Sequence, residues 1–163
     1  MKPKQTFSAM NPDLAKERKA ASQFPLEELT NWIYQGQANV ELLRKLRKKI
    51  ESEPAFNKDE LIFLDRTQRY NKGIQMAMKL YEWVREGEID EQQFDSAYSV
   101  LAEFLPTGPH HSMFVFCISH MTTDEQKQKW YPLVQQGVMW GAYAQTELGH
   151  GSNVQGLETT ATY

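Results

Sequence analysis

The segment Tyr143–Asn153 places two glycines among several hydrogen-bonding side chains. Gly149 and Gly151 would let the backbone approach a flat ligand closely. The hydroxyl of Thr146 and the N–H groups beside it could hydrogen-bond the carbonyl oxygens and ring nitrogens of such a ligand. The spacing is not a dinucleotide-binding fingerprint, because Val154 stands where a third glycine is needed. The residues alone leave two interpretations open, a ligand-binding turn and a plain polar hairpin turn.

Histidine and cysteine side chains could in principle supply a metal site or a nucleophile. His110 and His111 are adjacent and would point apart on a helix, and neither His120 nor His150 stands at a recognised ligand spacing from them. The motifs HExxH and CxxC are both absent, so we expect no metal. Cys117, the single cysteine, lies in an apolar run, where a neutral thiol packs as a small hydrophobe.

Two further patterns have a functional and a structural interpretation. The basic run 44–49 could bind a phosphate or an anionic lipid, but its charges alternate with leucines, which is typical of the solvated face of an amphipathic helix. A second group could line a lipid or cofactor pocket, although helical spacing favours an ordinary core. This group consists of Met76, Met78, Tyr81 and Trp83.

The composition describes a folded chain with a small negative charge. The 163 residues carry 18 Lys+Arg and 21 Asp+Glu, which gives a net charge of −3 and argues against a nucleic-acid-binding protein. Hydrophobic residues make up 40%, enough for a core. No apolar run has the length of a membrane span, and the first ten residues lack the apolar region of a secretory signal.

Apolar residues recur at helical spacing over most of residues 25–137. A first helix is expected between Pro25 and Gly36, with Leu26, Leu29 and Ile33 on one face, and a second over residues 40–50 before Pro54. A longer helix is expected to begin at a capping box and to run to about residue 86, with Gly87 beyond its end. The expected box is Asn57 with Glu60, and the expected apolar face is Ile74, Ala77, Met78, Tyr81 and Val84.

Two more helices are expected on either side of the break at residues 106–109. Asp90 can cap the first, whose apolar face is Phe94, Ala97, Tyr98, Leu101 and Phe104. Residues 113–118 are apolar on all sides, so we expect this segment to be buried on most of its surface. The last helix is expected to open at Thr122 with Glu125, or at Thr123 with Gln126, and to end by residue 137.

The pattern changes at Val138. Residues 138–144 and 159–163 are rich in strand-forming residues and flank a polar turn. A folded chain rarely ends on a strand without a partner, so we expect the natural protein to continue. The predicted division is a helical domain over residues 1–137 and the start of a β domain over residues 138–163.

Several segments resemble one enzyme family. The segment Tyr143–Ser152 resembles the flavin-contacting loop of acyl-CoA oxidases, and residues 11–18, 66–70 and 156–163 are also similar to that family. Residues 123–132 resemble the helix that precedes the β domain in the wider acyl-CoA dehydrogenase superfamily. The elements Gln-Thr-Glu and Glu-Thr-Thr-Ala-Thr are typical of the oxidase branch.

The resemblance implies a mainly α chain: the N-terminal helical domain of the acyl-CoA dehydrogenase/oxidase fold plus the first strands of its middle β domain. It also implies a peroxisomal, FAD-dependent enzyme of fatty-acid β-oxidation, which converts fatty acyl-CoA into trans-2-enoyl-CoA and reduces O2 to H2O2. The implied partners are fatty acyl-CoA and O2, with a homodimer at full length and neither nucleic acid nor a membrane span.

The family's functional residues can be carried over to five positions. Thr146 falls on the flavin-binding threonine, and Tyr143 and Gln145 fall on the strand that backs the flavin. Gly151 and Ser152 fall on the turn near the thioester and pantetheine part of the substrate. The general-base glutamate, a second flavin-binding stretch and any peroxisomal targeting signal are expected beyond residue 163.

Two alternatives stay beside the oxidase. The first is a truncated, non-catalytic helical module that pairs with full-length subunits, and the second is an acyl-CoA dehydrogenase that uses an electron-transfer flavoprotein. The segments 11–14 and 145–147 favour the oxidase over the dehydrogenase. Glu147 lies in the flavin loop and is not expected to be the base. Acyl chain-length specificity is expected to depend on residues outside this chain.

Overall fold

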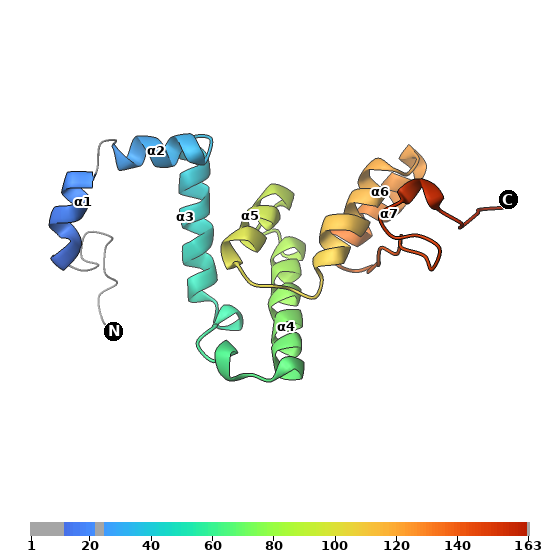
Figure 1. The fold of residues 1–163 in the computed structure, drawn as a ribbon, viewed down its shortest axis with the longest axis horizontal. Helices are drawn as coiled ribbons and strands as arrows, with labels where there is room; N and C mark the ends of the chain where they lie inside the picture. Colours follow the sequence, from blue (N-terminus) through green and yellow to red (C-terminus); the bar gives the residue numbers. More distant parts are fainter. Residues whose placement is uncertain (1–11, 22–24, 163) are drawn as a thin grey trace. The chain divides into compact units, whose positions relative to one another are not determined.

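The structure, a computed structural model, describes residues 12–21 and 25–162. Asn11 and Tyr163, at which several of the segments named above begin or end, lie outside the described residues. The described chain is mainly helical (Figure 1). Its α-helices are α1 (Ala15–Ala21), α2 (Leu26–Ile33), α3 (Gln37–Ser52), α4 (Arg66–Arg85), α5 (Glu91–Leu101), α6 (Val115–His120) and α7 (Asp124–Gln135). Shorter turns are the 3-10 helices η2 (Pro12–Leu14), η3 (Pro54–Phe56), η4 (Leu61–Phe63) and η6 (Val154–Gly156), and the π-helix η5 (His110–Phe114).

The chain divides into two compact units, Met1–Lys45 and Leu46–Tyr163, with the boundary inside α3. In the first unit, α2 ends where Gln35 and Gly36 take positive φ values, as the sequence predicts for Gly36. The predicted apolar face of α2 is helical, but Leu26, Leu29 and Ile33 are all exposed.

The second unit is organised around α4, which packs against α5 and η3. The predicted capping box at Asn57 is wrong. Asn57 Oδ1 instead accepts a hydrogen bond from the N–H of Asp59, and a full capping box forms at Asp65 with Gln68. Asp65 occupies the cap because residues 54–63 are taken up by two 3-10 turns separated by a turn at residues 59–60, so that α4 begins later than expected.

Aromatic rings fill the core on two sides of α4. Tyr81 lies 4.8 Å from Phe94 and 4.9 Å from Trp140 between ring centroids, and the ring of Trp83 meets Phe56 edge-on at 5.1 Å. The predicted face of α4 is only partly right: of its five residues Ala77 and Tyr81 are buried, Ile74 and Val84 are half-buried and Met78 is exposed. The buried surface is wider than predicted, because Trp83 faces η3 while Tyr81 faces α5. The buried residues of α4 are Gly73, Met76, Ala77, Leu80, Tyr81 and Trp83.

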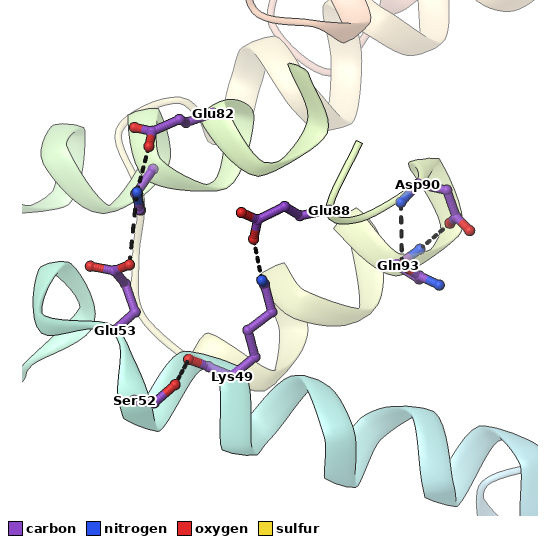
Figure 2. Close-up of polar contacts among 8 residues, drawn as sticks. Lys49, Ser52, Glu53, Glu82, Glu88, Asp90 and Gln93 are labelled. Carbon is purple, nitrogen blue, oxygen red and sulfur yellow. Dashed lines mark hydrogen bonds and ion pairs between the residues drawn. The ribbon is translucent and has the colours of Figure 1, made fainter. Parts of the chain in front are cut away.

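Polar contacts join the end of α3 to α4 and to the turn before α5 (Figure 2). Lys49 pairs with Glu88 and lies over the ring of Trp83. Lys79 lies between Glu53 and Glu82. The rest of the basic run 44–49 lies on the solvated face of α3, as predicted, and Lys49 is the half-buried member that contacts the core.

Helix α5 begins at the predicted Asp90, which forms a capping box with Gln93 (Figure 2). It ends at Leu101, and Ala102 takes the left-handed conformation, so Phe104 leaves the predicted apolar face and is exposed. Helix α7 begins at the predicted box of Thr123 with Gln126.

Helix α6 packs against η5 and α7 (Figure 1). The expected burial of residues 113–118 is wrong, since Met113 and Phe116 are exposed and the other four residues are half-buried. The contacts with η5 and α7 therefore cover only part of the surface of this segment. Cys117 is half-buried there as a free thiol.

The predicted strands over residues 138–144 and 159–163 do not form within the described residues, where the only β-type pairing is an isolated bridge between Glu147 and His150. A strand needs a neighbour to receive its ladder hydrogen bonds, and the described residues supply none alongside these segments. Within residues 12–21 and 25–162, no helix combines the length and apolar character that a bilayer crossing needs.

Candidate functional site

The segment that leaves α7 is fixed at its start by a buried histidine. His110 in η5 is 3% exposed; its Nε2 lies 3.3 Å from the carbonyl oxygen of Val134, and its Nδ1 accepts a hydrogen bond of 3.1 Å from the N–H of Gly141. Because Nδ1 is the acceptor, Nε2 carries the proton and donates to Val134. Both ring nitrogens are therefore used structurally, which leaves His110 unsuited to bind a metal.

The position of Gly141 also needs the absence of a side chain. A Cβ atom built there would lie 2.3 Å from ring carbons of Phe114 in η5. The ring of Trp140 packs 4.5 Å from His110 between centroids. Burial lowers the pKa of His110, with the neighbouring His111 charge acting in the same direction. Gly141 is thus held by the neutral, packed ring of His110, and the chain continues from there to Thr146.

Residues 142–146 present unused hydrogen-bonding groups. Among the described residues, no hydrogen bond to the backbone N–H or C=O groups of this segment is formed. Thr146 is exposed, and its hydroxyl has no partner in the described part of the chain. Tyr143 donates its phenol hydrogen to Oε1 of Gln145 at 3.2 Å, so these two predicted site residues contact each other.

Glu147 closes the loop that follows Thr146. Its carboxylate accepts hydrogen bonds from the backbone N–H groups of Glu158, at 2.6 Å, and Thr159, at 2.9 Å, and a further one from the Thr159 hydroxyl. Nε2 of His150 lies 2.9 Å from Glu147 Oε2. The Thr159 hydroxyl, followed by the N–H of Glu158, lowers the pKa of the Glu147 carboxyl. The sequence pattern does not indicate this role, although Glu147 and Glu158–Thr159 both lie in segments that resemble the oxidase family.

The two predicted substrate-contact residues lie at the exposed part of this loop. Gly151 and Ser152 are both exposed. No atom lies within 4 Å of the place where a Cβ atom of Gly151 would stand, so the described chain itself does not require glycine there. Nδ1 of His150 lies 3.3 Å from the carbonyl oxygen of Gly151. His150 therefore contacts the turn from its inner side, while Gly151 and Ser152 face solvent.

These features fit a flat ligand with polar edges. Thr146 offers a hydroxyl, residues 142–146 offer unpaired backbone groups, and Gly151 offers room for close approach. The five predicted residues are close together in the sequence, and in the structure only Tyr143 and Gln145 among them share a hydrogen bond. Among the described residues, no group of three His, Cys, Asp or Glu side chains is arranged to hold a metal ion.

A separate cavity of about 310 Å³ lies between α4, α5, η5–α6 and α7. His111 Nε2 pairs with Asp95 Oδ1 at 2.7 Å there, and the Tyr131 hydroxyl donates to Glu91. Burial, and then Glu91, raise the pKa of Tyr131. None of the predicted site residues lines this cavity.

Comparison with known proteins identifies relatives over nearly the whole chain. The chain is 37% identical over 158 residues to human peroxisomal acyl-coenzyme A oxidase 1 and 36% identical over 159 residues to the rat protein of that name, in both cases over 94% of this chain and 24% of the relative. The chain therefore spans about a quarter of the length of these relatives.

Solved structures agree with this similarity. An acyl-CoA oxidase from tomato matches with a TM-score of 0.81 and 35% identity, over 93% of this chain and 23% of that one. Acyl-CoA oxidase-2 of Caenorhabditis elegans, solved with FAD, ascaroside-CoA and ATP, matches with a TM-score of 0.79 and 28% identity, over 94% of this chain and 24% of that one. The acyl-coenzyme A oxidase N-terminal family model matches residues 25–139. The chain belongs to the acyl-coenzyme A oxidase N-terminal family.

Proposed function

We propose that this chain is the N-terminal helical part of a peroxisomal, FAD-dependent acyl-CoA oxidase. The observation that carries the proposal is the family match over residues 25–139, together with relatives named as peroxisomal acyl-CoA oxidases. The proposed substrates of the whole enzyme are fatty acyl-CoA and O2, the products are trans-2-enoyl-CoA and H2O2, and the proposed assembly is a homodimer.

In this proposal the stretch 143–152 forms part of the flavin and substrate site. FAD would supply the two-electron redox chemistry that no side chain of this segment can perform. Thr146 would hydrogen-bond the polar edge of the flavin, and Tyr143 and Gln145 would back it. Gly151 and Ser152 would lie near the thioester and pantetheine part of the substrate. The exposed hydroxyl of Thr146 and the open space at Gly151 support these assignments.

We also propose that residues 138–163 begin the middle β domain. The family model ends at residue 139, close to the predicted boundary after residue 137. The unpaired backbone groups of residues 142–146 are those that a neighbouring strand would use. The general base and the second flavin-binding stretch would then come from the rest of the enzyme.

A chimera tests the proposal. The matched quarter of rat peroxisomal acyl-CoA oxidase 1 is replaced by this chain, and the purified chimera is assayed for bound FAD and for peroxide formation from fatty acyl-CoA. We expect stoichiometric FAD and acyl-CoA-dependent peroxide. A chimera that melts as cooperatively as the rat enzyme but holds no FAD would contradict the proposal.

A further inference from the structure

The loop after Thr146 is closed by a single carboxylate. Glu147 accepts through Oε2 from His150 and the N–H of Glu158, and through Oε1 from the N–H and the hydroxyl of Thr159. Hydrogen bonds to a charged acceptor are stronger than those between neutral groups. The side chain of His150 is 2% exposed and that of Glu147 is 19% exposed, so the contact between these two is shielded from water, whereas Glu158 and Thr159 lie exposed at the surface.

These contacts join segments that are apart in the sequence. The donors at Glu158 and Thr159 stand 11 and 12 residues beyond Glu147. The bridge between Glu147 and His150 adds two backbone hydrogen bonds, of 3.2 and 3.3 Å. Residues 147–159 therefore form one closed loop, with Gly151 and Ser152 on its exposed part.

Thr146 has few contacts of its own. Its hydroxyl has no partner in the described chain, and the backbone of residues 142–146 makes no hydrogen bonds there. The nearest fixed points are Gly141, bonded to His110, and Glu147, which is the next residue. The placement of Thr146 consequently depends on how firmly Glu147 is held.

We propose that Glu147 is a positioning residue that, with His150, holds Thr146 and the turn Gly151–Ser152 in a fixed relation to the flavin and the acyl-CoA thioester. This inference rests on the proposed function. It assigns Glu147 no proton transfer, because every contact of its carboxylate is with a donor of its own loop.

Two measurements on Glu147→Gln test the inference. The amide group would place a donor against other donors, so we expect faster hydrogen exchange at the N–H groups of Glu158 and Thr159 in the 163-residue chain. In the FAD-loaded chimera we expect FAD to bind roughly tenfold more weakly, with a changed flavin absorption band. Glu147→Asp keeps the carboxylate and should recover part of the affinity.

Glu125→Gln is the matched control, because Glu125 lies exposed in the first turn of α7 and takes no part in the hydrogen bonds of Glu147. It should leave both readouts unchanged. Should Glu147→Gln fail to fold, Thr159→Val decides, since it removes one hydroxyl donor and keeps both backbone donors. We expect Thr159→Val to weaken FAD binding by about threefold.

Each remaining outcome counts against the inference. Unchanged exchange at Glu158 and Thr159 would show that Glu147 does not close the loop. Faster exchange with unchanged FAD affinity in the folded fraction would leave Glu147 with a structural role only, while the proposed function stands. An unaltered chimera that binds no FAD would overturn the proposed function and the inference together.

Discussion

Thr146 is the residue on which the flavin assignment most depends. Its hydroxyl has no hydrogen-bond partner in the described chain, so it does not merely satisfy the turn. We predict that Thr146→Val leaves the melting temperature of the 163-residue chain unchanged. In the chimera the lost hydrogen bond, worth roughly 0.5–1.5 kcal/mol, should weaken FAD binding by about 2- to 13-fold.

Titration of apo-chimera with FAD, compared with its thermal melt, measures both quantities. Unchanged affinity with a lowered melting temperature would remove Thr146 from the flavin site.

His110 should make the stability of the chain depend on pH. Burial lowers its pKa below the ordinary value of 6.5, so the unfolded chain binds the proton more readily than the folded one. We expect the free energy of unfolding to fall as the pH falls through 6.5 toward the lowered pKa. Above pH 6.5 the contribution of the neutral His110 to stability is present in full. Urea unfolding between about pH 8 and about pH 5 measures this slope.

His110→Phe serves as the comparison. It keeps an aromatic ring beside Tyr81 and Trp140 but leaves the N–H of Gly141 and the carbonyl of Val134 without a partner. It should lower the free energy of unfolding by about 1–3 kcal/mol at neutral pH and flatten the slope. An undiminished slope would assign the pH dependence to other groups.

Individual residues differ in how far the sequence predicts their role. The closeness of Thr146 to the turn Gly151–Ser152 follows from their closeness along the chain. The role of Glu147 does not, because its partners at Glu158 and Thr159 become neighbours only when the loop closes. The same holds for His110, whose partners lie 24 and 31 residues away.

Among the elements, glycines with positive φ values follow α2, α4 and α7, and the last two permit a matched test. Gly87 follows α4 with φ +70°, and Gly137 follows α7 with φ +64°. A Cβ atom at Gly137 would lie 2.8 Å from the ring of the buried Tyr81, whereas one at Gly87 would meet nothing within 4 Å.

We predict that Gly87→Ala costs about 1–2 kcal/mol, the usual penalty of a left-handed non-glycine residue. Gly137→Ala should cost roughly 1–3 kcal/mol more, because the Tyr81 ring cannot move without disturbing Phe94 and Trp140. Urea unfolding gives both values. Equal costs would mean that the ring yields and that the packing around Tyr81 is looser than the structure describes.

Helix boundaries were predictable where the signal is local. Asp90 and Thr123 cap the helices that the sequence assigned to them, and Gly87 and Gly137 end α4 and α7. The start of α4 was not, because Asn57 and Asp65 offer competing caps and the 3-10 turns between them decide the choice. Strand formation over residues 138–144 depends on a neighbouring strand, which local propensity cannot supply.

Considered as a whole, the chain covers about a quarter of the length of the human and rat relatives. We predict that the purified 163-residue chain alone forms no peroxide from fatty acyl-CoA, even with saturating FAD. Loss of a general base alone costs about 10²- to 10⁴-fold, and an incomplete flavin site should prevent the redox step altogether. A peroxide-coupled assay, with the chimera as positive control, measures this, and turnover above background would refute it.

A crystal structure of the FAD-loaded chimera would show whether the stretch 143–152 forms part of a flavin site. We expect the hydroxyl of Thr146 to lie about 2.8 Å from a polar atom on the edge of the isoalloxazine ring, with Glu147 still bonded to the backbone of Glu158 and Thr159. A flavin bound elsewhere, with Thr146 facing solvent or another strand, would contradict it.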